Sequence, residues 1–230
     1  MLKVKSVLVS QPKPETEKSP YFDLSKDCKV KIDFRPFIHL EGVTGKDFRQ
    51  QRVNFLDFSA VIFTSRNAID YYFKTAEEAR VTIPDDMKYF CISESTAFYL
   101  QKYIVYRKRK IFYGEQTFAD LIKVLKKHNK DNKFLLPCSD ILRQTIPDLL
   151  KENEIDYKCV NLYNTVCSDL SDLSDVNYDI LVFFSPSGIK SLFQNFPTFK
   201  QNDTRIAVFG PTTAKAAEDA GLNIDIAAPK

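Results

Sequence analysis

The sequence predicts an α/β fold built from two related halves, each with a parallel sheet covered by helices. Short apolar segments rich in β-branched and aromatic residues alternate with helix-like segments along almost the whole chain, a pattern that is typical of parallel sheets. Three elements also recur in the same order in both halves, which indicates an internal repeat. Two longer extended segments, 30–40 and 156–166, interrupt the alternation.

Composition narrows the class of protein. The chain has 230 residues, 44% of them hydrophobic and 27% charged, which suits a globular protein with a sizeable core. A net charge of +3 is too small to indicate nucleic-acid binding. No apolar run is long enough to span a membrane, and the first residues do not read as a signal peptide. Five scattered cysteines lack a CxxC pair or metal-ligand spacing, so we expect reduced thiols, a cytoplasmic protein and no metal site.

The first half alternates between expected strands and helices. Expected strands lie at 4–9, 30–40, 60–64, 88–92 and 104–107, and expected helices at 21–26, 44–55, 65–79 and 96–103. Ser19-Pro20 is a start signal for the first helix. Pro36 cannot donate a backbone hydrogen bond, so 30–40 is expected to be an edge strand or a linker.

The second half repeats the alternation. Expected strands lie at 133–137, 156–166, 179–184, 206–209 and 224–226, and expected helices at 118–128, 142–153 and 186–196. After 206–209, Gly210-Pro211 breaks the strand and an alanine-rich helix follows. We expect Thr212 or Thr213 to cap this helix and Gly221 to end it.

The repeat can be aligned without gaps. Residues 63–73 align with 183–193, each as strand, serine turn and helix, and residues 90–97 align with 207–214. The extended segments 32–40 and 155–163 align as well. The halves are therefore about 1–106 and 107–230.

Serines and threonines follow the expected strands at the ends where an α/β sheet binds its ligands. Backbone N–H groups and helix dipoles at such turns attract anions. Two such crevices facing each other would suit a large ligand that carries many carboxylates. The candidate binding residues are Ser10, Thr64, Ser65, Arg66, Ser93, Thr96, Ser139, Arg143, Ser185, Ser187, Gly188, Gly210, Thr212 and Thr213. An alternative is that these are ordinary strand-to-helix turns.

Several basic residues can likewise be interpreted either as ligand contacts or as ordinary surface residues. Arg66 and Arg143 are each expected at a helix start, where they could contact an anion. The run from Arg107 to Lys110 reads either as a solvated charge run on an edge strand or as a patch that attracts polyanions.

Several motifs together resemble a known family. FTS-x-x-A at 63–68, FFSPSG at 183–188 and GPTTA at 210–214 are similar to those of uroporphyrinogen-III synthase, as is the segment 136–150 leading into 160–165. The resemblance covers nearly the whole chain and is greatest to the Bacteroidetes branch.

This resemblance implies two parallel-sheet α/β domains, flavodoxin- or Rossmann-like, joined by a two-stranded β-ladder. One domain would comprise 1–36 with 167–230 and the other 41–158, and 30–40 and 156–166 would form the ladder.

The resemblance also implies a reaction: cyclisation of hydroxymethylbilane to uroporphyrinogen III, without metal or organic cofactor, by a monomer that binds neither nucleic acid nor membrane. Tyr163 matches the tyrosine that the family places at the end of its second crossing strand. It would donate a hydrogen bond to the leaving oxygen, or it would be structural only.

Two other classes of protein are compatible with parts of this pattern. A non-catalytic bilobed protein that binds a polycarboxylate would share the crevices. Another cofactor-free or nucleotide-dependent α/β transferase would need a glycine-rich phosphate loop, and the chain has only six glycines and no GxGxxG or GK[ST] motif.

Overall fold

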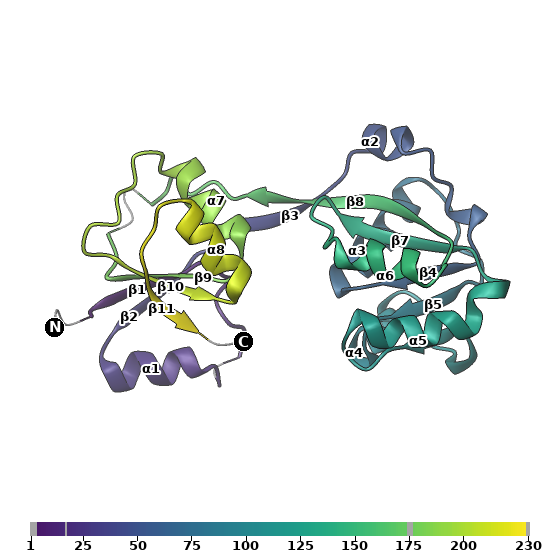
Figure 1. Cartoon of the computed structure of the whole chain (residues 1–230), viewed down its shortest axis with the longest axis horizontal. Helices are drawn as coiled ribbons and strands as arrows, with labels where there is room; N and C mark the ends of the chain where they lie inside the picture. The colour runs from purple at the N-terminus through teal and green to yellow at the C-terminus, as the bar shows by residue number, and fades with distance from the viewer. Residues whose placement is uncertain (1–3, 17, 174–176, 229–230) are drawn as a thin grey trace. The chain divides into compact units, whose positions relative to one another are not determined.

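The computed structural model describes residues 4–16, 18–173 and 177–228 and is shown in Figure 1. The chain divides into two compact units. Unit 1 is Met1–His39 with Thr165–Lys230, and unit 2 is Leu40–Asn164. Unit 1 is therefore built from both ends of the chain and unit 2 from its middle.

Unit 1 contains a five-stranded sheet in the order β11-β10-β9-β1-β2, in which every neighbouring pair is parallel. Its strands are β1 (Ser6–Val9), β2 (Lys31–Phe34), β9 (Ile180–Phe183), β10 (Arg205–Phe209) and β11 (Ile224–Ala228). Its helices are α1 (Pro20–Cys28), α7 (Pro186–Asn195) and α8 (Pro211–Asp219). Each helix follows a strand, as parallel pairing requires.

Helices cover both faces of the sheet of unit 1 (Figure 1). Leu181 and Phe183 of β9 lie in one core cluster with residues of α7 and α8. Val182, between them, lies in a second cluster against which Tyr21 of α1 packs. Successive side chains of a strand point to opposite faces. The uninterrupted apolar run of β9 is therefore buried on both sides.

Unit 2 contains a six-stranded sheet in the order β3-β8-β7-β4-β5-β6. Its strands are β3 (Ile38–Gly42), β4 (Ala60–Phe63), β5 (Lys88–Cys91), β6 (Ile111–Tyr113), β7 (Phe134–Ser139) and β8 (Tyr157–Cys167). From β8 to β6 all pairs are parallel. Its helices are α2 (Gly45–Gln50), α3 (Arg66–Glu78), α4 (Glu94–Tyr99), α5 (Phe118–His128) and α6 (Thr145–Glu152).

The central strand β4 of unit 2 is buried on both faces. Val61 and Phe63 pack in the cluster that contains residues of α3 and α4. Ala60 and Ile62 pack in the cluster that contains residues of α5 and α6. The four residues are fully buried.

The two units share one strand order, and this confirms the predicted fold class. In unit 1 the order β2-β1-β9-β10-β11 is the 2-1-3-4-5 order of flavodoxin-like sheets. In unit 2 the order β8-β7-β4-β5-β6 is the same spatial arrangement. There the chain forms the third, fourth and fifth places first, as β4, β5 and β6, and the first two places last, as β7 and β8. The repeated segments 63–73 and 183–193 accordingly form β4–α3 and β9–α7, which occupy equivalent places.

The extended segment predicted at 30–40 is two strands rather than one. Lys31–Phe34 pairs with β1 in the sheet of unit 1, whereas β3 (Ile38–Gly42) pairs with β8. The break falls at Pro36, which has no N–H to donate to a sheet. Phe37, only 1% exposed, is buried in the core of unit 1. Of this segment, only β3 therefore pairs with the second extended segment.

The strand predicted at 104–107 is wrong, and β6 was missed. The N–H of Ile104 bonds to the carbonyl of Leu100 and so continues the preceding helical turn. Ile104 and Tyr106 pack against the unit 2 core. The edge beside β5 is occupied instead by β6, after a 3-10 turn at Lys108–Lys110. The Arg107–Lys110 run thus precedes the edge strand rather than forming it.

Candidate functional site

Two predicted site residues, Ser65 and Tyr163, meet at the carboxyl edge of the unit 2 sheet, and Ser139 is paired with Tyr163. The register of β7 and β8 shifts between Cys138 and Ser139, so that Ser139 pairs with Tyr163 and Leu162 is skipped. This bulge places both Leu162 and Tyr163 in one core cluster. Ser65, just after β4, has its Oγ 3.5 Å from the Tyr163 hydroxyl.

The Tyr163 ring is held by packing. It is 7% exposed and stacks on Tyr71 of α3, with ring centroids 4.8 Å apart and an interplanar angle of 14°. The Tyr71 hydroxyl in turn donates to the carbonyl of Leu40 at 2.9 Å. Burial raises the pKa of Tyr163, against a smaller opposite effect of Ser65. Tyr163 is therefore a neutral phenol at physiological pH and a hydrogen-bond donor.

The repeated segments contain the starts of four helices, α3, α4, α7 and α8. Serine side chains cap the first three of these helices. Ser65, Ser93 and Ser185 precede α3, α4 and α7 and accept the N–H of the residue three positions later, at 3.1, 3.3 and 3.3 Å. Each serine thus supplies a side-chain acceptor to an N–H group in the first turn of its helix. Because Ser93 acts as the cap, α4 begins two residues earlier than predicted.

The fourth repeat helix, α8, starts differently, and the prediction that Thr212 or Thr213 caps it is wrong. Its N-cap is Gly210, at φ +82°, and no side chain caps the helix. Positive φ at glycine and Pro211 at the first helical position start the helix earlier than expected. Thr212 is exposed and Thr213 buried, both within the first turn. Within the part of the chain that the structure describes, no capping side chain therefore accepts the first N–H groups of α8.

Gly221 ends α8, as predicted. It has φ +79°, its N–H bonds to the carbonyl of Glu218, and the N–H of Leu222 bonds to the carbonyl of Ala217. These two bonds form a Schellman motif.

In unit 1, Ser10, Ser185 and Gly188 lie together beside the ends of β1 and β9. The N–H of Ser10 bonds to the Val182 carbonyl at 3.0 Å. A Cβ added at Gly188 would lie 3.7 Å from the Ser10 Oγ and 3.8 Å from the Ser185 Oγ. β1 and β9 are the strands from which the chain continues to opposite faces of the sheet. This is the switch point at which open α/β sheets bind ligands.

The remaining predicted residues lie at the same carboxyl edges with different exposure. Arg66, the first residue of α3, is exposed, and its guanidinium lies 5.4 Å from the centre of the Tyr99 ring. Arg143 is exposed in the loop before α6 (Thr145–Glu152), so the prediction that it starts a helix is wrong. Thr64 and Ser187 are half-buried, and Thr96 is buried with its hydroxyl 3.1 Å from that of Ser93.

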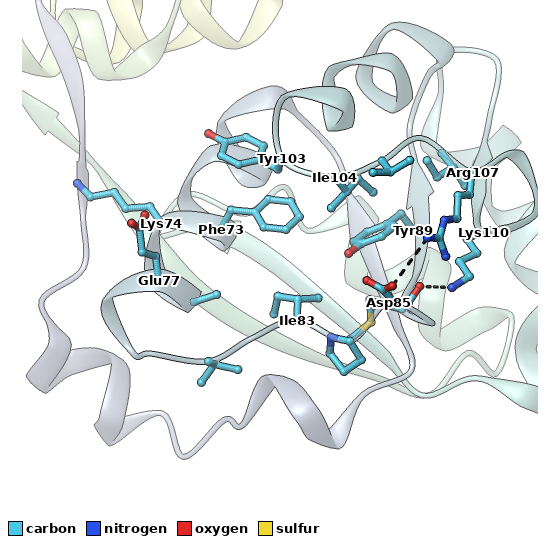
Figure 2. Close-up of a pocket in the computed structure, with 16 residues that line it drawn as sticks. Phe73, Lys74, Glu77, Ile83, Asp85, Tyr89, Tyr103, Ile104, Arg107 and Lys110 are labelled. Carbon is cyan, nitrogen blue, oxygen red and sulfur yellow. Dashed lines mark hydrogen bonds and ion pairs between the residues drawn. The ribbon is translucent and has the colours of Figure 1, made fainter.

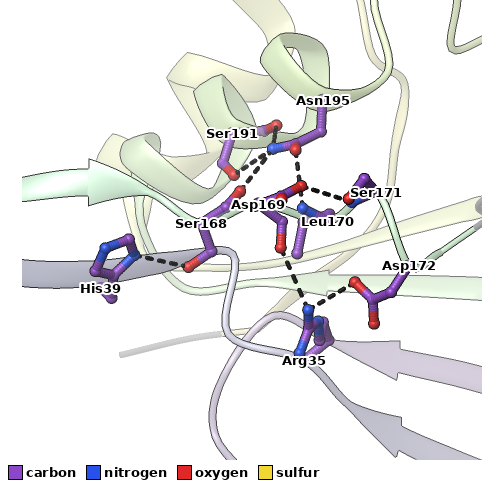
Figure 3. A network of polar contacts seen from close by, with 9 residues as sticks. All are labelled: Arg35, His39, Ser168, Asp169, Leu170, Ser171, Asp172, Ser191 and Asn195. Atoms are coloured by element: carbon purple, nitrogen blue, oxygen red, sulfur yellow. Dashed lines mark hydrogen bonds and ion pairs between the residues drawn. The ribbon is translucent and has the colours of Figure 1, made fainter.

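Sequence reasoning missed a polar network in unit 1 that is centred on Arg35, directly after β2 (Figure 3). Arg35 donates to the Asp172 carboxylate at 2.6 Å and to the Asp169 carbonyl at 3.3 Å. Its Nε is buried and has no partner among the described residues. His39 lies 3.1 Å from the Ser168 hydroxyl. The network joins residues 35–39 to 168–172, and an arginine directly after a strand was its only signal in the sequence.

Unit 2 has a cavity of about 650 Å³, whose lining residues are shown in Figure 2. Met87, just before β5, and Ile111, the first residue of β6, line it, so it opens at the amino edge of the sheet. Arg107 lies 3.8 Å from the Asp85 carboxylate, and Lys110 donates to the Asp85 carbonyl. No predicted site residue is among the described residues that line this cavity.

The described ranges contain neither a candidate metal site nor a candidate membrane-spanning helix. Within 4–16, 18–173 and 177–228, no group of three or more His, Cys, Asp or Glu residues could hold a metal ion. Over the same ranges, no helix has the length and apolar character needed to cross a membrane.

Comparison with known proteins gives one consistent family. A family model described as uroporphyrinogen-III synthase HemD matches residues 29–230. A uroporphyrinogen-III synthase from Chlorobaculum parvum is 26% identical over 241 residues, which cover 97% of this chain and 92% of that protein.

Solved structures are similar in fold. Uroporphyrinogen-III synthetase from Helicobacter pylori matches with a TM-score of 0.61 and 17% identity, and a mutant uroporphyrinogen III synthase from Thermus thermophilus matches with 0.55 and 13%. Each match covers 97% of this chain and 92% of the other.

Proposed function

The chain belongs to the uroporphyrinogen-III synthase family, and from this membership we propose that it cyclises hydroxymethylbilane to uroporphyrinogen III. The reaction releases water and inverts the last pyrrole ring. The match of the family model over 29–230 is the observation that carries the proposal. The hydroxyl-rich carboxyl edges of the two sheets support it, since such edges hold ligands in open α/β folds.

Tyr163 is the proposed hydrogen-bond donor to the leaving oxygen. An electron-rich pyrrole expels the hydroxyl of its own hydroxymethyl group, and the oxygen departs as water once it is protonated or hydrogen-bonded. A neutral phenol can assist this step without ionising. Burial of Tyr163 and its stacking on Tyr71 support the role, because both keep the hydroxyl protonated and fixed. The rest of catalysis is positioning, so that the substituted carbon of the last ring attacks.

The carboxylates of the substrate are proposed to bind at the turns that follow the strands. The uncapped start of α8 at Gly210 offers backbone N–H groups, and Arg66 and Arg143 offer exposed cations. One helix start contributes about 0.3–1 kcal/mol toward an anion. Binding would therefore be the sum of many contacts, to which Ser10, Ser139, Ser185 and the other predicted residues contribute.

We also propose that 1–36 with 167–230 and 41–158 act as two domains. The two compact units, which divide between residues 39 and 40 and between 164 and 165, support this division. The protein is proposed to work as a cytoplasmic monomer without cofactor.

The test is to incubate the purified protein with freshly made hydroxymethylbilane and to separate uroporphyrin I from uroporphyrin III after oxidation. The proposal predicts isomer III well above the level formed without protein. Spontaneous ring closure gives isomer I, so a product that is only isomer I would reject the enzyme. Tight binding of a tetrapyrrole without turnover would favour the non-catalytic polycarboxylate-binding alternative instead.

A further inference from the structure

Two phenylalanines at the carboxyl edge of unit 1 form a stacked pair that the predicted site does not include. Phe184 directly follows β9, and Phe209 ends the adjacent strand β10. Their ring centroids are 4.5 Å apart with an interplanar angle of 16°. Phe209 is 40% exposed, whereas Phe183, one residue before Phe184, is fully buried.

The equivalent positions of unit 2 carry no such pair. In the repeat, Phe184 aligns with Thr64 and Phe209 with Ile92. The sheet can therefore end at these positions without aromatic rings. Phe184 packs against the small cluster of Val9, Val182 and Ala207, while Phe209 is in no core cluster of the described residues. The exposed ring is consequently not needed to fill the interior.

The pair lies where two adjacent strands end and the helices that follow them begin. Phe209 is followed at once by Gly210 and Pro211, which start α8 without a side-chain cap. Phe184 is followed by Ser185, whose side chain caps α7. Phe184 packs with Val182 on the face of the sheet that α1 covers, and the strand register sets Phe209 beside it, so the pair lies on that face at the carboxyl edge. A flat, electron-rich ring fits such an exposed aromatic face.

We propose that Phe184 and Phe209 form a stacking platform for one pyrrole ring of the substrate. The inference rests on the proposed function and adds two specificity-determining residues to it. A pyrrole can stack on the exposed face of Phe209 in the offset manner that aromatic pairs prefer. This contact fixes the plane in which that ring lies.

The experiment compares Phe209→Leu and Phe184→Leu with Phe98→Leu as a matched control. Phe98 is also exposed, at 50%, and stacks on Tyr106 with centroids 5.5 Å apart, but it lies in unit 2 within α4, whose start is capped by Ser93. Leucine keeps apolar bulk and removes the aromatic face. Phe209→Trp restores an aromatic face and is the rescue variant. Melting temperatures establish that each variant is folded.

Two readouts are measured, the KM for hydroxymethylbilane and the Kd for uroporphyrin III from quenching of porphyrin fluorescence. Loss of one aromatic stacking contact should raise each about 2- to 13-fold in the Phe209→Leu and Phe184→Leu variants. Phe98→Leu and Phe209→Trp should stay near wild type. Equal constants for the platform variants and Phe98→Leu would overturn the platform.

The two proposals fail in different ways. If the wild-type protein makes no uroporphyrinogen III, the proposed function is rejected. The Kd for uroporphyrin III still decides then whether the phenylalanine pair receives a tetrapyrrole ring. If the wild-type protein turns over and the platform variants match Phe98→Leu, the function stands and the platform is rejected.

Discussion

Replacement of Tyr163 by phenylalanine should lower the rate of uroporphyrinogen III formation without unfolding the protein. The change removes only the hydroxyl, because the ring remains 7% exposed and stacked on Tyr71. The hydroxyl lies 3.5 Å from the Ser65 Oγ, at the long limit for a hydrogen bond, so its loss should cost at most about 0.5 kcal/mol of stability. General-acid groups contribute about 10²–10⁴-fold to rates. Since the pyrrole assists departure of the oxygen, we expect a loss of kcat of about 10²-fold or less.

The assay is the initial rate of uroporphyrinogen III formation, with melting temperatures as a control for folding. Tyr71→Phe is the matched variant, because it removes the other hydroxyl of the same stacked pair. That hydroxyl donates to the Leu40 carbonyl. Burial raises the pKa of Tyr163 above its ordinary value of about 10. The Tyr163 hydroxyl is thus a neutral donor at pH values below about 10. Donation is lost only as the pH rises through the raised pKa. Complete loss of activity in a folded Tyr163→Phe would refute catalysis by distributed positioning, and an unchanged rate would refute the role of the hydroxyl.

Three further predictions concern stability and access to the site. Tyr72→Phe should raise the free energy of unfolding by about 1 kcal/mol, because the Tyr72 hydroxyl is buried and has no partner among the described residues. The gain should appear as a higher Tm, and a lower Tm would mean that the hydroxyl is hydrogen-bonded. Ser185→Ala should lower the free energy of unfolding by about 1 kcal/mol, because it removes the side-chain cap on the Gly188 N–H. Chemical denaturation measures this loss, and an unchanged free energy would show the cap to be dispensable. Gly188→Ala should stay active, because the added Cβ would lie 3.4 Å from the Phe183 ring, which is an ordinary contact distance. Gly188→Leu should lower the initial rate, because its larger side chain would block approach of the substrate to the backbone. Equal rates for the two variants would rule out close approach at this position.

The sequence predicted the architecture well because the signals were redundant. Apolar runs such as Val61–Phe63 can be buried only in a sheet covered on both faces, and the repeat assigned the same elements to both halves. Where one local signal decided, prediction failed. Residues 104–107 have the β-branched and aromatic content of a strand, yet Ile104 continues a helical turn and packs on the core, which periodicity cannot reveal.

The candidate site was predictable in position and less so in detail. Serines before α3, α4 and α7 indicated the turns, but which residue caps α8 depended on the backbone of Gly210. The stacking of Tyr163 on Tyr71 depends on a bulge in β8 that leaves no mark in the sequence. Phe209 reads as one more residue of a buried strand, and only its exposure distinguishes it.

The location of the ligand is tested most directly by hydrogen–deuterium exchange of the protein with and without uroporphyrinogen III. If the carboxyl edges of the sheets hold the tetrapyrrole, amide protection should rise at the starts of α3 and α4 in unit 2 and of α7 and α8 in unit 1, with the uncapped N–H groups after Gly210 among the most affected. Protection confined to the cavity at the amino edge of unit 2, around Ile83–Met87 and Ile104–Ile111, would contradict the account.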